Sequence, residues 1–159
     1  MKICKENNKI IIYLQNKILK KVDFDNKELL EEYFEELFFK LKRILNLKLK
    51  GFYIVHVYID KIYGAVIELK KEEFDYEYDE VDMQLIIEKS CFLYKINDYF
   101  FLNDDIKKHI NMYLYNKKLY ITFNDDILEK DIIKMIENIE IIYNSKDILL
   151  VAKKINQNH

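Results

Sequence analysis

The stretch GFYIVHVYIDKIYGAVIEL, residues 51–69, decides the fold expected for this 159-residue chain. Apolar residues alternate with other residues on both sides of a short centre at residues 60–62, a pattern that predicts a β-hairpin. In each strand the apolar residues share one face, because side chains alternate along a strand. The members of the two apolar rows are Val55, Val57 and Ile59, then Ala65, Ile67 and Leu69.

The same stretch holds the only two glycines of a chain that has no proline. A phosphate-binding loop needs several glycines where a strand passes into a helix, because backbone amides must approach the phosphate closely. Gly51 and Gly64 instead border predicted strands, far apart in sequence. We therefore interpret Gly51 as the opening of a strand and Gly64 as a position that leaves room for the ring of Tyr58 across the hairpin.

Composition excludes several classes of protein. Lys and Arg number 26 against 28 Asp and Glu, so the net charge is that of neither a basic nucleic-acid-binding protein nor a polyanion. Cys4 and Cys91 belong to no CxxC or Cys/His cluster, so neither a metal site nor a disulfide is expected. Without a leader pattern or a run of about 20 apolar residues, we expect a cytoplasmic protein with no membrane segment and no cofactor.

Two segments have the apolar spacing of amphipathic helices. The first, residues 23–45, begins with Asp25 as the predicted N-cap and Glu28 as its capping-box partner. The second, residues 125–139, follows Asn124 as its predicted N-cap. The apolar stripes of the two helices are Leu30, Phe34, Leu37, Leu41 and Ile44, and then Leu128, Ile132, Met135, Ile136 and Ile139.

Short apolar runs elsewhere predict further strands. Residues 9–14 form a strand before the first helix, and a hairpin is expected where residues 92–96 and 99–102 flank an Asn-Asp turn. A second hairpin is expected around Asn116 and Lys117, with Leu114 opposite Leu119, Met112 opposite Ile121 and Tyr113 opposite Tyr120. Residues 148–152 are the predicted last strand.

These elements predict an α+β fold in which two amphipathic helices pack on a largely antiparallel sheet, in the order βαββ followed by βββαβ. Residues 1–159 are long enough for one domain. The alternative is two lobes, residues 1–70 and 91–155, joined by a segment at residues 72–82.

That joining segment, EEFDYEYDEVD, alternates rings and carboxylates. In an extended chain the rings would line one face and the acids the other. Such a surface suits a basic partner, or mimicry of a nucleic-acid backbone as in some phage-encoded inhibitors. The structural alternative is an edge strand whose acids prevent aggregation. The residues concerned are Phe74, Tyr76 and Tyr78 on one face and Asp75, Glu77 and Asp79 on the other.

The sequence contains no catalytic motif. Ser90, Ser145 and the two cysteines stand in no recognisable nucleophile arrangement. His56, in the middle of a predicted strand, is more simply a residue of the sheet than a base, although a site built from His56 and scattered acids stays an alternative. The pairs at residues 104–105 and 125–126 lack the loop of a calcium site and are interpreted as acids at helix starts.

The segment MYLYNKKLYITFNDDILEKDIIKMIE, residues 112–137, resembles the hairpin and helix of the C-terminal domain of MecA-type adaptors. KIIIYL, EELFF and GFYIVHVYIDK follow the order of elements in the N-terminal domain of that family. The hairpin turn lacks the glycine of the family pattern, and no long acidic linker joins the halves. The resemblance implies a bacterial, non-enzymatic adaptor that delivers substrates to a Clp-type AAA+ unfoldase.

We therefore predict a small intracellular protein-binding module, an adaptor or regulator without catalysis. Its partner is expected to be another protein, an AAA+ unfoldase or one with a basic surface, and its oligomeric state is left open. The alternatives are a phage-type inhibitor that mimics nucleic acid and an enzyme with a site around His56. Besides the ring and acid residues of the joining segment, the predicted contact residues are Tyr113, Tyr115 and Tyr120.

Overall fold

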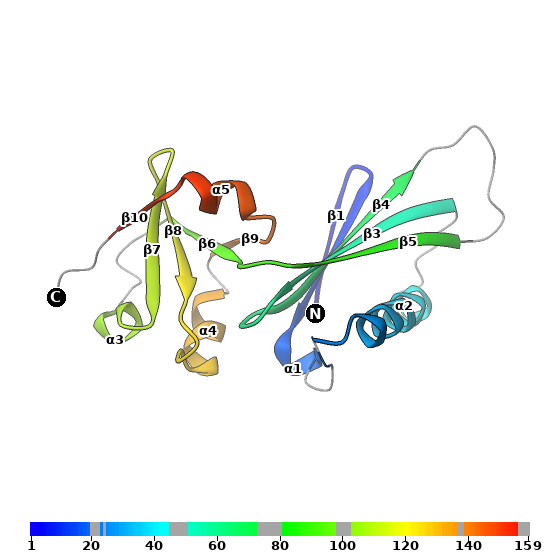
Figure 1. The fold of residues 1–159 in the computed structure, drawn as a ribbon, viewed down its shortest axis with the longest axis horizontal. Helices are drawn as coiled ribbons and strands as arrows, with labels where there is room; N and C mark the ends of the chain where they lie inside the picture. The colour runs from blue at the N-terminus through cyan, green and yellow to red at the C-terminus, as the bar shows by residue number, and fades with distance from the viewer. Residues whose placement is uncertain are drawn as a thin grey trace. The chain divides into compact units, whose positions relative to one another are not determined.

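The computed structural model describes residues 1–19, 23, 25–44, 51–72, 81–97, 103–136 and 139–155. The chain has a mixed α+β fold and divides into two compact units. The first unit comprises Met1–Ile59 and Tyr63–Lys89, and the second comprises Asp60–Ile62 and Ser90–His159. Each unit is built around one five-stranded sheet (Figure 1). None of the helices in these ranges is long and apolar enough to cross a membrane.

The first sheet has the strand order β1-β2-β4-β3-β5. Strands β1 and β2 pair antiparallel, as do β2 and β4, whereas β3 and β5 run parallel. In a simple meander β5 would pair antiparallel with β4, the strand before it, whereas here β5 pairs parallel with β3. The strands are β1 (Lys2–Glu6), β2 (Lys9–Gln15), β3 (Gly51–Asp60), β4 (Gly64–Glu72) and β5 (Val81–Lys89).

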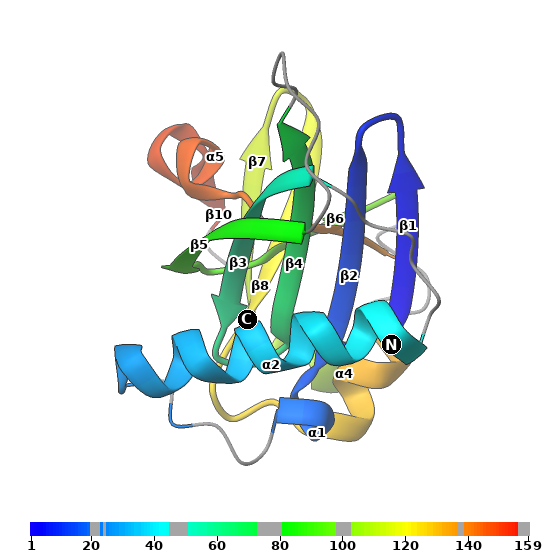
Figure 2. The ribbon, with the colours of Figure 1, turned by 90° about the vertical axis from the view of Figure 1, so that its right-hand side faces the viewer.

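Helix α2 (Lys27–Ile44) covers one face of this sheet, and the short helix α1 (Asn16–Leu19) follows β2 (Figure 2). The apolar stripe of α2 packs on the two rows of the β3–β4 hairpin, so the predicted core face is confirmed. The predicted cap is wrong by one residue, because the side chain of Asn26 accepts the Leu29 amide hydrogen at 3.2 Å. Three members of the predicted stripe are buried and Leu37 is partly buried, whereas Phe38, which was not predicted, is buried as well; the buried three are Leu30, Phe34 and Leu41.

Gly64 serves a different purpose from the one predicted. Its φ is +130°, and a Cβ there would lie 2.3 Å from the Leu14 carbonyl oxygen and 2.8 Å from the Asn16 nitrogen. The space at Gly64 is therefore taken by the backbone of β2, not by the ring of Tyr58.

The second sheet has the order β10-β7-β8-β6-β9, with every pair antiparallel. Three helices, α3 (Asp104–Lys107), α4 (Glu129–Ile136) and α5 (Lys146–Val151), connect its strands. The strands are β6 (Leu93–Ile96), β7 (Ile110–Tyr115), β8 (Lys118–Phe123), β9 (Glu140–Ile142) and β10 (Lys153–Ile155).

The β7–β8 hairpin has the predicted register: Tyr113 pairs with Tyr120, Met112 with Ile121 and Leu114 with Leu119. Its two turn residues, Asn116 and Lys117, have φ values of 47° and 62°. Positive φ at both turn positions matches the right-handed twist of the strands, which is why a two-residue turn suffices without glycine.

Two predictions for the second unit are wrong, and a third falls on residues that are not described. The expected hairpin partner of residues 92–96, residues 99–102, lies outside the described residues, and β6 pairs with β8 on one side and with β9 on the other. Residues 148–152 lie mostly in helix α5, and the last strand, β10, begins after them. Helix α4 begins at Glu129, since Asp125 and Asp126 lie in a turn and the Asn124 side chain accepts a hydrogen bond from Asn111 at 2.6 Å.

The observed order of elements therefore differs from βαββ followed by βββαβ. The first unit begins with the β1–β2 hairpin, whose first strand was not predicted, and continues with two helices and three strands. In the second unit helices alternate with single strands or a hairpin. Residues 73–80, which carry the alternating rings and acids, lie outside the described residues, between the end of β4 and the start of β5.

Candidate functional site

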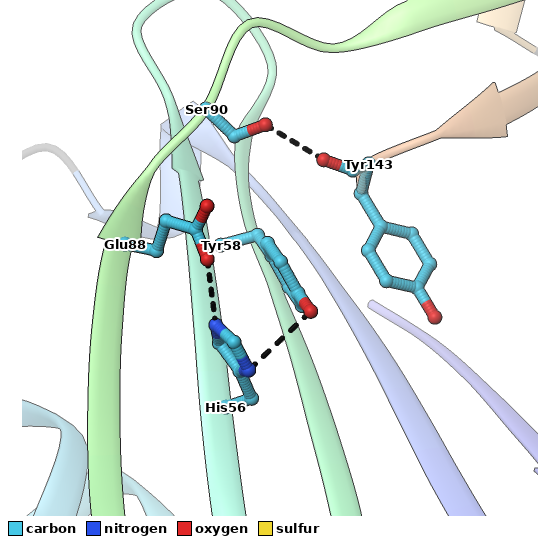
Figure 3. Close-up of polar contacts among 5 residues, drawn as sticks. All are labelled: His56, Tyr58, Glu88, Ser90 and Tyr143. Atoms are coloured by element: carbon cyan, nitrogen blue, oxygen red, sulfur yellow. Dashed lines mark hydrogen bonds and ion pairs between the residues drawn. The ribbon is translucent and has the colours of Figure 1, made fainter. Parts of the chain in front are cut away.

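The densest polar cluster described in the first unit joins His56, Tyr58 and Glu88 (Figure 3). His56 and Tyr58 are two residues apart on β3, so both point to the face opposite the core row of Val55 and Val57. The parallel register places Glu88 of β5 beside Tyr58. The strand pairing therefore brings together three side chains that are 32 residues apart at most.

His56 lies between the other two groups. Its Nε2 is 2.9 Å from Glu88 Oε2, and its Nδ1 is 3.3 Å from the Tyr58 hydroxyl. The imidazole and phenol rings stack with centroids 4.1 Å apart and planes 10° apart. If Tyr58 donates to Nδ1, then a neutral His56 donates from Nε2 to the carboxylate, and every polar atom in the chain of hydrogen bonds has its proper role.

The phenol of Tyr58 keeps its proton at neutral pH. Burial, and then the negative charges of Glu68 and Glu88, raise its pKa to about 12. Tyr58 therefore acts as a hydrogen-bond donor and not as a nucleophile. Both ring nitrogens of His56 are occupied, and a general base needs one that can reach a substrate proton. The cluster is well suited to fixing β5 against β3.

A second cluster lies in the second unit around the buried carboxylate of Asp60. Its two oxygens accept hydrogen bonds from the amides of Ile62 and Phe92, each at 2.8 Å. Burial of the thiol, and then the Asp60 charge, raise the pKa of Cys91. A thiol with a raised pKa is a poor nucleophile at neutral pH, although part of Cys91 reaches solvent.

Metal ligation finds no support in the described ranges, where no three His, Cys, Asp or Glu side chains converge. The acids of residues 104–105 open helix α3, as predicted, with Asn103 as the cap whose side chain accepts the Ile106 amide hydrogen at 2.8 Å. Asp126 instead lies 3.0 Å from Nδ1 of His109, and Asp125 lies 2.8 Å from Nζ of Lys61.

The predicted contact tyrosines of the second unit share one face of the β7–β8 hairpin. Tyr113 and Tyr115 are partly exposed, whereas Tyr120 is only 5% exposed. Tyr113 and Tyr115 therefore offer a phenol to solvent, and Tyr120 contributes mainly to packing. The predicted contacts in the ring and acid segment (Phe74, Asp75, Tyr76, Glu77, Tyr78 and Asp79) lie outside the described residues.

Helix α5 presents an apolar surface that the sequence pattern did not reveal. Leu150 is 77% exposed and Val151 66%, and no residue of the helix is buried. Leu114 of β7, 44% exposed, pairs with Lys153, the first residue after α5 and its cap. Ser145 before the helix and an aspartate in its first turn are start signals that could have predicted it.

No protein-family model, curated protein or solved structure matches the chain significantly.

Proposed function

We propose that the chain is a small protein-binding module that acts as an adaptor or regulator and has no reaction of its own. The observation that carries the proposal is helix α5, which exposes Leu150 and Val151 and has no fully buried residue. Each fully exposed Leu or Val forgoes roughly 1.5–3 kcal/mol of burial. A six-residue helix that offers two of them to solvent is typical of a surface completed by a partner.

The neighbouring strand extends this surface. Strand β10, which comes after α5, pairs with β7, and the exposed Leu114 of β7 lies opposite Lys153. The partly exposed Tyr113 and Tyr115 flank Leu114 in sequence and lie on the other face of β7. Apolar side chains at the centre with tyrosines beside them are a common composition of a protein interface. We call Leu114, Leu150 and Val151 the α5 patch.

The partner class follows from two arguments. The resemblance of residues 112–137 to MecA-type adaptors suggests an AAA+ unfoldase, and the acids at residues 75, 77 and 79 suggest a basic surface. In the proposal the α5 patch supplies affinity, and the ring and acid segment supplies electrostatic selection. A phage-type inhibitor would use the same acids as a mimic of nucleic-acid phosphates. A reaction at His56 would require a shift of at least one of its two hydrogen bonds.

The test is site-specific photo-crosslinking in the cell of origin. A photoreactive amino acid at position 150 should yield one dominant adduct, and the same residue at the exposed Lys134 of helix α4 serves as the control. Identical adduct patterns at positions 134 and 150 would contradict a specific α5 surface.

The double variant Leu150→Gln and Val151→Thr preserves side-chain size and removes the apolar surface. We expect it to weaken capture of the crosslinked partner by tenfold or more, with an unchanged circular dichroism spectrum because both side chains are exposed. Full retention of binding by this folded variant would refute the role of the patch.

The ring and acid segment is tested separately with Tyr76→Ala and Tyr78→Ala. Loss of the partner in this variant supports a second contact. A complex that weakens steeply with salt favours the inhibitor that mimics nucleic acid, and an insensitive complex argues against it.

A further inference from the structure

The two sheets have four edge strands, and three of them carry the features that prevent pairing with another chain. Strands β9 and β10 have three residues each, with Glu140 in the former and two lysines in the latter. Strand β1 carries Lys2, Lys5 and Glu6 within five residues. These edges are short, charged or both.

The fourth edge, β5, is longer, and its charges lie near its two ends. It is nine residues long, with Asp82, Glu88 and Lys89 as its charged residues, and its five central residues, 83–87, are uncharged. Figure 2 shows β5 and β1 at opposite edges of the first sheet, and within the described part of the chain β3 is the one strand paired with β5. An open edge of this length and composition is a template for strand addition.

The side chains of β5 are two-sided. Met83, Leu85 and Ile87 pack against the core of the first unit, whereas Gln84 and Ile86 are exposed on the opposite face, Ile86 by 38%. Adding a strand at this edge would extend the core row and cover part of Ile86 at the same time.

We propose that β5 pairs antiparallel with β5 of a second copy of this chain, around a twofold axis at Ile86. Such pairing joins two five-stranded sheets into one continuous sheet. The twofold axis is perpendicular to the sheet, and residues directly opposite each other share a face. Side chains alternate between the two faces, so the two residues of each opposed pair both have even numbers or both have odd numbers.

The side chains select the register within this set. With the axis at Ile86, Ile86 faces its own copy, Leu85 faces Ile87 of the partner subunit, and Gln84 faces Glu88 of the partner subunit. With the axis at Leu85, Asp82 would face Glu88 of the partner subunit twice, and like charges directly opposite are unfavourable. An axis at Gln84 would set Asp82 against Ile86 of the partner subunit. The axis at Ile86 avoids both mismatches in the centre of the strand, and its one apolar–charged pair, Met83 with Lys89 of the partner subunit, lies at the end of β5.

Glu88 already has a partner within its own chain, because its Oε2 lies 2.9 Å from His56 Nε2 on β3 (Figure 3). Self-association goes beyond the adaptor proposal, which concerns a different strand and helix.

The experiment is sedimentation velocity of the full chain over a series of concentrations from low to high micromolar. Edge pairing over seven residues forms a small interface, so we expect a reversible monomer–dimer equilibrium in the micromolar range. A wild-type chain that is monomeric throughout this series would overturn the proposal.

Two charge variants on the same face of β5 test the register. Ile86→Lys places two lysines opposite each other at the axis and should weaken the dimer at least tenfold. Gln84→Lys adds the same charge two residues away, but opposite Glu88 of the partner subunit, and should leave the dimer as strong or stronger. Both positions are exposed, so circular dichroism should show that each variant is folded.

The contrast between the two variants decides the outcome. A dimer that is weakened equally by Gln84→Lys and Ile86→Lys would refute the twofold β5 contact. A dimer that is unaffected by either would place the interface elsewhere and would also refute it.

Discussion

Substitution of the two glycines by alanine tests how the first sheet is built, because they share a backbone conformation but not an environment. Gly51 has φ +104° and Gly64 has φ +130°, so an alanine at either position adopts a disfavoured conformation at a cost of about 1–3 kcal/mol. A Cβ at Gly51 would meet the Cε of Lys71 at 3.0 Å, and this flexible side chain can move away.

At Gly64 the obstacle is backbone. The added Cβ would lie 2.3 Å from the Leu14 carbonyl oxygen, at the end of the β2–β4 ladder where Gln15 and Gly64 are Cα partners. Relieving this clash requires β2 to shift, and such overpacking costs roughly 1–3 kcal/mol or more beyond the conformational term. We expect Gly64→Ala to lower the free energy of unfolding by about 2–3 kcal/mol more than Gly51→Ala.

The assay is urea unfolding monitored by circular dichroism, together with amide hydrogen exchange. In Gly64→Ala the amides of β2 and β4 should exchange faster, whereas in Gly51→Ala they should change little. Equal destabilisation by the two substitutions would show that the positive φ, and not the approach of β2, decides the requirement for glycine. The reasoning would then be refuted.

Three further predictions concern ionisable groups. Burial raises the pKa of Tyr58 to about 12, so its contribution to stability should be constant below the unfolded pKa of about 10 and fall by about 1–2 kcal/mol as the pH rises to 12. The readout is the difference in phenolate absorbance between the chain and its Tyr58→Phe variant, and a difference that develops near pH 10 would contradict the prediction. Asp60→Asn should lower the pKa of Cys91 and speed its reaction with a disulfide reagent at pH 8, and an unchanged rate would argue against the charge effect. Glu88→Gln should keep an acceptor for His56 and change unfolding by less than about 0.5 kcal/mol, whereas Glu88→Ala should cost about 1 kcal/mol, and equal effects in urea unfolding would contradict the hydrogen bond.

Local patterns predicted those elements whose stability depends on nearby residues. Helix α2 follows from the spacing of its apolar stripe, and the β7–β8 register follows from a two-residue turn that fixes which side chains face each other. The cap at Asn26 was misplaced by one residue because Asp25 and Asn26 are both good cap residues.

Short apolar runs were ambiguous for a physical reason. Residues 148–151 read ILLV, which suits a strand or a helix equally over so few residues. Strand β6 was expected to pair with the residues that follow it, 99–102, which lie outside the described residues. It pairs with β8 on one side and with β9 on the other. The choice of strand partner depends on contacts that are distant in sequence.

For the candidate sites, too, the sequence predicted local features but not contacts between distant residues. The sequence identified His56 but gave no reason to connect it with Glu88, since the contact arises from a parallel pairing of β3 with β5 across 32 residues. The exposed α5 patch was missed because exposure depends on what the rest of the unit covers.

By itself the sequence determined the α+β class, the long helix with its buried stripe and both central hairpins, because periodicity and turn chemistry act over a few residues. Only the tertiary structure decided the division into two sheets, the parallel β5 and the close approach of β2 that makes Gly64 necessary. These features depend on which strands pair with each other, and the pairing depends on how whole faces of the sheets pack. Gly64, which looked from the sequence like a residue of the sheet that leaves room for a ring, is required because another strand passes where its side chain would be.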